Sequence, residues 1–363
     1  MSTDGSAAPE GAPAEAAPPL PAPAETAASP RRSRWVAWLN ATCLALGVVL
    51  LVVLVFKLDL QQVGARLRLV GWAFLGVFGA HVLGLVVTAA GWRCMVDPVR
   101  SRARFRDFLG AFWVGYSINA LTPGAQLGAV LRVTILRDKV DSEELIASLV
   151  TLSFFSYAST MALTLLAPLL CLALLDLPTR TVLVVFGIAV VFCVPMLLIY
   201  LFLRRGAAAA IINLIRRLPF VRFKDPERVA EKAQAIDRSI RTFRQQRPRL
   251  FLYAVLWIAG ARLCQVLEYA VLLPVLIPGR GLLWLVALAF LTQASSQLLA
   301  WAMTFVPSQV GVAEANTTLL YKLLGLDPVV GLTVEIVRRI RTVLGVAIGL
   351  LIGWAVGVRR TPG

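Results

Sequence analysis

Charged residues are scarce in this sequence, and their scarcity excludes an ordinary soluble protein. Asp, Glu, Lys and Arg make up only 15% of the 363 residues, whereas 58% of the residues are apolar. Soluble domains carry about 25% charged and about 45–50% apolar residues. Apolar runs of about 20 residues, long enough to cross a bilayer core of about 30 Å, recur along the chain. We therefore expect an all-α polytopic membrane protein.

The usual ligands and nucleophiles of enzymes are also missing. The one histidine, His81, lies inside an apolar run without an HExxH motif or a carboxylate cluster, and a packed polar contact is its expected role. The five cysteines form no CxxC pair. No nucleophile–base pair or phosphate-binding loop is evident. We expect no metal, no cofactor and no enzymatic activity.

The first 30 residues contain no Lys or Arg and are rich in Ala and Pro. Such a segment buries too little surface to offset its ordering entropy, so we expect it to be disordered. It lacks the basic start of a signal peptide. Three arginines then precede an apolar run, residues 35–56, which is predicted to be the first span with its N-terminus in the cytoplasm.

The formal net charge is +16, and the positive residues gather in short loops beside apolar runs. This distribution orients membrane proteins with their basic loops in the cytoplasm, suits anionic lipid headgroups and argues against nucleic acid as a partner. It predicts a multi-pass protein of the cell membrane with both termini in the cytoplasm. The remaining predicted spans are Val70–Trp92, Leu145–Leu175, Thr181–Leu203, Leu250–Ile277 and Val329–Val358.

The apolar segment 108–136 lies between two basic flanks. If both flanks are cytoplasmic, the segment enters the membrane and turns back near Thr122-Pro123-Gly124. A turn exposed to lipid would leave peptide groups unsatisfied at a cost of several kcal/mol each. We therefore expect protein or a water-filled cavity around this turn.

A second broken segment, residues 281–326, contains the stretch FVPSQVGVAEAN at 305–316. The basic end of the last span places Asp327 outside, so this segment is predicted to be a second re-entrant hairpin with the opposite orientation. About six full spans and two such hairpins follow the inverted-repeat logic of transporters, with possible membrane halves at 31–203 and 251–363. Alternatively, each hairpin crosses fully and breaks the positive-inside rule.

The largest polar stretch, residues 204–250, connects the two halves. Its apolar residues recur at intervals of four and three, which predicts an amphipathic helix. The basic opposite face suits an anionic cytoplasmic membrane surface. The alternative is a helix packed as a cap on cytosolic loops.

Candidate binding residues lie at the two breaks. Free amides at a helix start carry positive partial charge, and a nearby arginine can join them to hold a phosphate. The alternatives are that Arg132 only reaches to the interface and that Glu314 only caps a helix. The candidates are Asn119, Pro123, Gly124, Gly128 and Arg132 in the first hairpin, and Pro307, Gly311, Glu314 and Asn316 in the second.

Charged residues inside predicted spans are costly and usually functional. Arg338, Arg339 and Arg341 lie in the outer third of the last span, and Glu335 can pair with Arg339 four residues further on. The other arginines need an acid or an anion, and Glu314 or a lipid phosphate would serve. Secondary candidates for the same cavity are Glu335, Arg262 and Glu268.

The stretches NALTPGAQLGAVLR (119–132), PSQVGVAEA (307–315) and RIRT (339–342) resemble the lysylphosphatidylglycerol synthase transmembrane-region family of flippase-like membrane proteins. The resemblance covers about residues 35–358. Ala129 departs from it where many members have an acid, and Ser308 and Gln309 replace a glycine pair, which bears on proton coupling and on the substrate. The matching positions are Asn119, Pro123, Gly128, Arg132, Pro307, Gly311, Glu314, Arg339 and Thr342.

The resemblance implies that this region moves aminoacylated phosphatidylglycerol between leaflets in bifunctional members. In those members, a soluble synthase domain makes that lipid. No such domain follows here, so we expect the transport half alone: a flippase-like transporter of a phospholipid or lipid-linked intermediate. The alternatives are an accessory or scaffold subunit of a cell-envelope glycolipid pathway and a membrane-embedded lipid transferase. A homo-oligomer is compatible with either role.

Overall fold

The computed structural model describes residues 60–98, 101–122, 127–174, 248–303 and 311–358, with a few isolated positions beside them. The predicted disordered tail, the first span, most of the span at 181–203 and nearly all of the connector at 204–250 lie outside the described residues. The contact of that connector with an anionic membrane surface therefore stays a prediction.

The described residues form helices and no strands, which confirms the all-α polytopic fold. Four of these helices are long and apolar enough to cross a membrane: α3, α6, α10 and α11. The helices are α2 (Leu60–Val70), α3 (Ala73–Cys94), α4 (Phe105–Leu121), α5 (Leu127–Leu136), α6 (Ser142–Leu174), α10 (Pro248–Leu276), α11 (Leu282–Ala302), α12 (Val312–Leu323) and α13 (Pro328–Val358).

One helix precedes the second predicted span and was not expected. The chain forms α2, bends at Gly71 and continues as α3. Gly71 has φ of +36°, a left-handed backbone conformation that glycine adopts at little cost. The predicted span at Val70–Trp92 therefore begins three residues later, at Ala73.

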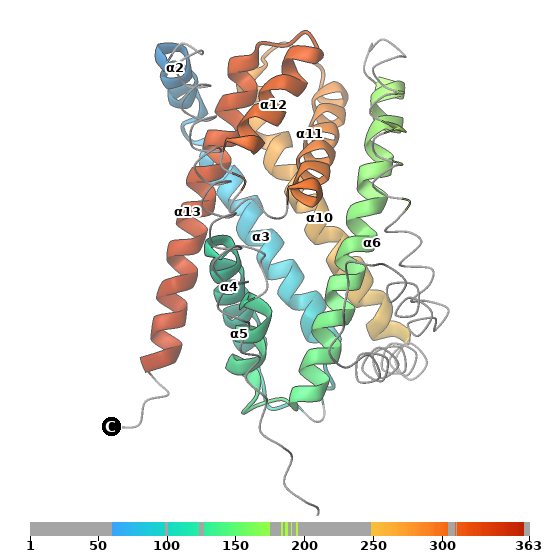
Figure 1. The fold of residues 1–363 in the computed structure, drawn as a ribbon, viewed down its shortest axis with the longest axis vertical. Helices are drawn as coiled ribbons and strands as arrows, with labels where there is room; N and C mark the ends of the chain where they lie inside the picture. The colour runs from blue at the N-terminus through green and yellow to red at the C-terminus, as the bar shows by residue number, and fades with distance from the viewer. Residues whose placement is uncertain are drawn as a thin grey trace, which may run out of the picture. The chain divides into compact units, whose positions relative to one another are not determined.

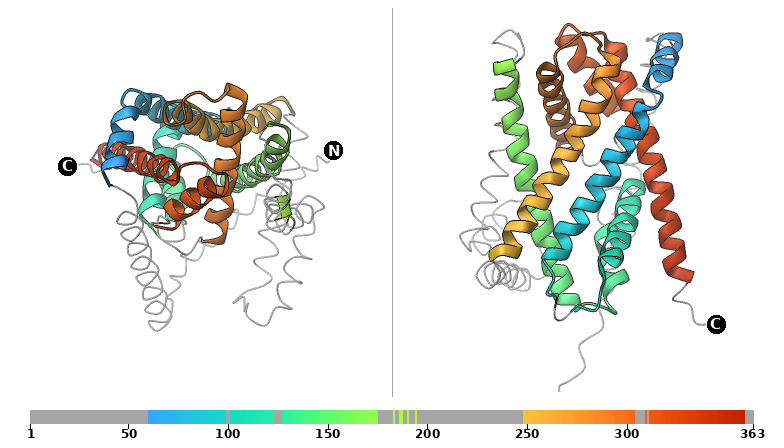
Figure 2. Two further views of the ribbon diagram at one scale, coloured as in Figure 1. Left: turned by 90° about the horizontal axis from the view of Figure 1, so that it is seen from above. Right: turned by 180° about the vertical axis from the view of Figure 1, so that it is seen from behind.

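The long helices α3 and α10 pack along each other, and α11 packs against α6 and α10 (Figures 1 and 2). Glycines of α3 allow the close approach: a Cβ at Gly91 would lie 3.2 Å from the Ile258 side chain, and one at Gly84 would lie 3.4 Å from Cys264. Small residues serve this purpose in membrane bundles, where close packing replaces the hydrophobic effect as the driving force.

Two broken hairpins occupy opposite ends of the bundle. Helices α4 and α5 lie at the lower end in Figure 1, and α11 and α12 lie at the upper end. The first hairpin breaks after Leu121, and the second breaks after Ala302, as the proline and glycine motifs predict. Helix α12 restarts after Gly311, whose φ of +78° suits glycine. The division of the chain into two related halves stays a prediction.

Besides a small third cluster at Val329 and Leu332, two large apolar clusters fill the interior of the described part. One gathers around Tyr269, Leu288 and Tyr321, and the other around Trp92 and Phe108. The outward positions are apolar as well. Exposed Leu, Val, Ile, Phe, Tyr and Trp side chains recur along the described helices, as expected of a surface that contacts lipid rather than water.

Candidate functional site

Glu314 lies in the first turn of α12, where its side chain is fully buried. The guanidinium of Arg339 on α13 donates to this carboxylate, with Nη2 at 3.0 Å from Oε2, and also to the backbone oxygen of Gln309 at 3.2 Å. The carboxylate of this first-turn acid thus binds an arginine of a neighbouring helix, so Glu314 does more than cap α12.

A second ion pair joins α10 to α13. Arg341 Nη1 lies 3.0 Å from Glu268 Oε1 and 2.6 Å from Nδ1 of His81 on α3. All three residues are at most 8% exposed. Because an arginine can only donate, His81 Nδ1 accepts in this contact, and the same nitrogen lies 3.4 Å from Glu268 Oε1. His81 thus ties three helices together, as the expected packed polar contact.

A third pair lies within α13 itself. Arg338 Nη1 is 3.3 Å from both oxygens of Glu335, and Thr317 of α12 donates to Glu335 at 2.8 Å. The Arg338 guanidinium also lies over the Tyr269 ring, 4.7 Å from its centroid. The pairing predicted between Glu335 and Arg339 is wrong. Successive residues of a helix are turned by 100°, so Arg339 faces α12 while Arg338 remains beside Glu335.

These six residues form what we call the charge network: Glu268, Glu314, Glu335, Arg338, Arg339 and Arg341. Three carboxylates face three guanidinium groups, so the formal charges cancel. Buried charges are tolerated when they are paired and hydrogen-bonded, and each partner of the network has that support. The arginines of α13 therefore do not need a lipid phosphate to neutralise them.

Arg132 of α5 is in a different situation. Its guanidinium lies over the Phe112 ring, 4.2 Å from the centroid, and its Nε is buried without a hydrogen-bond partner. A Cβ at Gly115 would lie 2.5 Å from this Nε, so the glycine provides the space for the arginine. Within the residues that the structure describes, no carboxylate pairs with Arg132.

Asn119 and Asn316 have polar partners near the two breaks. The Asn119 side-chain oxygen accepts from the backbone N–H of Gly128 at 2.7 Å and holds the start of α5 against α4. Asn316 Oδ1 accepts from Ser295 at 3.0 Å, and its Nδ2 is buried without a partner. Pro123, Gly124 and Pro307 lie outside the described residues.

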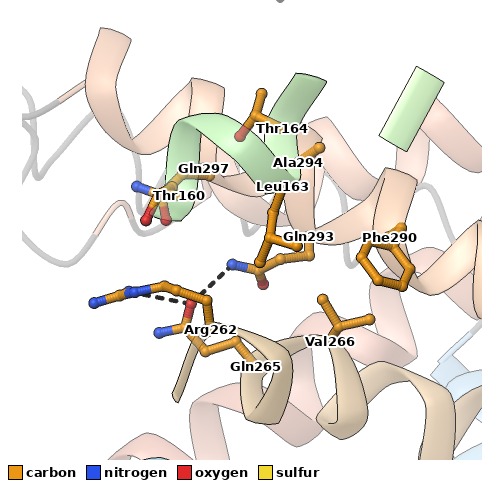
Figure 3. A pocket seen from close by; sticks show the side chains of 10 residues that line it. All are labelled: Thr160, Leu163, Thr164, Arg262, Gln265, Val266, Phe290, Gln293, Ala294 and Gln297. Carbon is orange, nitrogen blue, oxygen red and sulfur yellow. Dashed lines mark hydrogen bonds between the residues drawn. The ribbon is translucent and has the colours of Figure 1, made fainter. Parts of the chain in front are cut away.

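Arg262 and Glu268 do not share one cavity. They are six residues apart on α10, which turns their side chains about 120° from each other. Glu268 belongs to the charge network, whereas Arg262 lines a cleft between α6, α10 and α11 (Figure 3). No group of three metal-ligating side chains occurs in the described part of the chain.

Sequence reasoning did not assign site roles to His81, Tyr269 and Thr317. His81 stood out only as the one histidine in an apolar run, which is a usable signal for a buried polar contact. Tyr269 and Thr317 carry no such signal, because an aromatic or hydroxyl side chain in a span is ordinary. Their contacts with Arg338 and Glu335 depend on how the helices pack.

The helical bundle, its apolar outer surface and its buried charges define a polytopic membrane protein. The family model described as the lysylphosphatidylglycerol synthase TM region matches residues 41–349. The chain belongs to this family. Neither the curated proteins nor the solved structures contain a match to it.

Proposed function

We propose that this protein is a flippase-like transporter that moves a phospholipid or lipid-linked intermediate between leaflets. The observation that supports the proposal most directly is Arg132, a cation without a carboxylate partner among the described residues, which lies on a broken hairpin. A charge inside a membrane is costly unless an opposite charge accompanies it. A lipid phosphate that passes the hairpin would supply this opposite charge.

The charge network has a different part in the proposal. Its charges cancel, and its ion pairs join the second hairpin to α13 and α13 to α10. Fixed dipoles and paired charges let a headgroup pass without a full desolvation cost. Glu314 and Arg339 thus act on transport by holding α12 in place, and Arg132 contacts the phosphate.

The proposal places the protein in the cell membrane with the ends of α4 and α5 toward the cytoplasm. The Arg102 backbone N–H donates to the Lys139 carbonyl at 3.0 Å, so the connections before α4 and after α5 lie side by side. Both connections are basic, and basic loops remain in the cytoplasm. The residues concerned are Arg93, Arg102, Arg104, Arg106, Arg137 and Lys139.

The test is translocation by the purified protein in liposomes that contain fluorescent phospholipids with anionic, zwitterionic or cationic headgroups. We expect Arg132→Gln to slow the translocation of its lipid about tenfold or more, since hydrogen bonds to charged groups contribute about 1.5–3 kcal/mol. Arg280→Gln is the control, because Arg280 stacks on Trp284 beyond the end of α10 and should leave translocation unchanged.

Equal translocation by the wild type and Arg132→Gln would contradict the assignment of Arg132. Chemical turnover of a headgroup by the purified protein would contradict transport without catalysis and favour a lipid transferase. Absence of translocation for the whole lipid panel would favour the accessory-subunit alternative.

A further inference from the structure

The cleft between α6, α10 and α11 is a polar feature in an apolar part of the bundle. The cleft is partly open, and its space of about 240 Å³ includes solvent outside the protein. Figure 3 shows that three helices contribute side chains with polar ends. These are Thr160 and Thr164 of α6, Arg262 and Gln265 of α10, and Gln293 and Gln297 of α11.

Arg262 lacks a carboxylate partner among the residues that the structure describes. Its Nη1 donates only to the side-chain oxygen of Gln265, at 3.3 Å, and its Nε is buried with no partner. Gln265 also accepts from Gln293 Nε2 at 3.1 Å, so one amide oxygen serves two donors (Figure 3). The neutral oxygen of Gln265 shares the positive charge of Arg262 but does not cancel it.

Gln293 provides a second, independent indication of a ligand site. The residue is only 8% exposed, and its Oε1 is buried without a hydrogen-bond partner. Buried polar groups are nearly always hydrogen-bonded, and an unsatisfied one costs about 1–3 kcal/mol. One cleft therefore holds an unpaired cation beside an unsatisfied amide acceptor.

The depth of Arg262 makes its charge expensive. The residue lies near the middle of the membrane-spanning helix α10, far from both of its ends. Intramembrane arginines usually pair with an anion or line a wet cavity. One guanidinium matches one negative charge, and a phosphodiester offers that charge with acceptor oxygens in a suitable geometry. The unsatisfied Gln293 oxygen requires a donor, such as a hydroxyl group, on the same ligand.

We propose that this cleft binds the phosphodiester of an anionic lipid whose headgroup carries a hydroxyl. Arg262 contacts the phosphate, and Gln293 accepts a hydrogen bond from the headgroup. No carboxylate lines the cleft, so it offers nothing to a cationic headgroup. The inference does not depend on the transport proposed above, because it concerns other helices and other residues than the broken hairpin of Arg132.

A lipid fits this position better than a free anion does. Residues next to the cleft residues on the same helices present large apolar side chains outward: Leu263 is 50% exposed, Leu267 is 43% exposed and Tyr157 is 52% exposed. Acyl chains can lie on such a surface while the phosphate reaches Arg262. A soluble phosphate would have to leave water and cross the apolar zone, which is unfavourable for a charge.

The test is binding of phosphatidylglycerol to the full chain in neutral detergent micelles, followed by the lipid-dependent rise in the thermal unfolding temperature. Phosphatidylcholine and water-soluble glycerophosphoglycerol are the comparison probes. We expect Arg262→Gln to weaken phosphatidylglycerol binding about tenfold or more, from the contribution of a charge-assisted hydrogen bond. Arg280→Gln removes the same charge outside the cleft and should bind as the wild type does.

Gln265→Glu keeps the inference testable if Arg262→Gln fails to fold. A carboxylate at this position can accept the same two hydrogen bonds from Arg262 and Gln293, and it cancels the positive charge. We expect this variant to fold, to be as stable as the wild type without lipid or more so, and to lose the stabilisation by phosphatidylglycerol.

Unchanged phosphatidylglycerol binding by Gln265→Glu and Arg262→Gln would overturn the proposal. Equal stabilisation by phosphatidylcholine would also overturn it, because the effect would not depend on the net charge of the lipid. Equal stabilisation by glycerophosphoglycerol would overturn the lipid as the source of the anion. Loss of translocation in Arg132→Gln with phosphatidylglycerol binding retained at Arg262 would show that the two sites are separate.

Discussion

The guanidinium of Arg339 on α13 and the buried carboxylate of Glu314 on α12 are bound to each other, with Nη2 3.0 Å from Oε2. Glu314 lies in the first turn of the helix that follows the second break, and Arg339 lies within the helix that follows the hairpin. This pair therefore attaches the inner end of a broken hairpin to a continuous helix. The stability of the hairpin should depend on both charges together rather than on either one.

Replacing Glu314 by Gln should destabilise the protein by about 3 kcal/mol, the lower end of the cost of removing one partner of a buried pair. The lower end applies because the Arg339 side chain is 31% exposed and the Glu314 side chain is 0% exposed. The double variant Glu314→Gln, Arg339→Gln should be more stable than Glu314→Gln alone. Chemical unfolding in mixed micelles measures each step of this cycle.

The control for that cycle is Asp327→Asn, which breaks the ion pair of Asp327 with Arg66. The Asp327 side chain is 39% exposed and the Arg66 side chain is 26% exposed, so the loss of stability should be below about 1 kcal/mol. An equal loss for Glu314→Gln and Asp327→Asn would contradict the role of burial in this argument.

Neutralising Glu268 should lower the stability of the protein more than neutralising Glu335 does. The carboxylate of Glu268 lies 3.0 Å from Arg341 Nη1 and 3.9 Å from Arg338 Nε, so Glu268→Gln weakens the compensation of two cations, of which Arg341 is buried. Glu335→Gln affects Arg338 alone, and a glutamine can still accept from Thr317. The unfolding free energies of the two variants, measured side by side, should rank Glu268→Gln as the less stable; the opposite order would contradict this assignment.

The close contact of α4 and α5 should make Gly128 intolerant of a methyl group. A Cβ there would overlap the Gly115 carbonyl and the Asn119 side chain, which also binds the Gly128 N–H. Gly128→Ala should cost about 1–3 kcal/mol, as overpacking does. The matched control on α4 is Gly110→Ala, whose Cβ would lie 3.6 Å from Ile352, an ordinary contact.

Gly110→Ala should be neutral or should stabilise by up to about 1 kcal/mol, since alanine favours helix. Thermal unfolding in detergent compares the two variants. Similar unfolding temperatures for both would show that α4 and α5 do not approach as closely as described.

Trp113 should contribute one hydrogen bond between the first hairpin and α13. Its indole Nε1 donates to the Gly345 carbonyl at 2.8 Å, and the residue is buried. Trp113→Phe keeps an aromatic ring but loses this bond, at a cost of about 1 kcal/mol. Trp257→Phe is the control, because Trp257 is 44% exposed on the outer face of α10. Unfolding curves that show the same small change for both would argue against the bond.

Several helix boundaries could be predicted because the residues that determine them lie close by in the sequence. Helix α4 ends at Leu121, immediately before the predicted turn, and α12 begins at Val312, after the glycine of the second motif. Pro328 begins α13, one residue before the predicted start of the last span, and a proline fits a first helical position. Run lengths and helix breakers act within a few residues, so these boundaries can be read without knowledge of the neighbouring helices.

The partners of the charges could not be predicted in the same way. Arg341 meets Glu268, 73 residues away, and His81, 260 residues away. The expected local pairing of Glu335 with Arg339 was wrong, because Glu335 pairs with Arg338 instead. Pairing depends on the rotation of each helix about its axis. The sequence does not indicate this rotation, because the residues on all sides of the helix are apolar.

The sequence by itself determined a polytopic helical membrane protein with two interrupted hairpins and a small set of intramembrane charges, because apolar run length, helix breakers and basic flanks act along the chain. Only the tertiary structure decided that the arginines of α13 are neutralised by carboxylates while Arg132 and Arg262 have none among the described residues. The physical reason is that the cost of a buried charge is set by its neighbours in space, and those neighbours come from other helices.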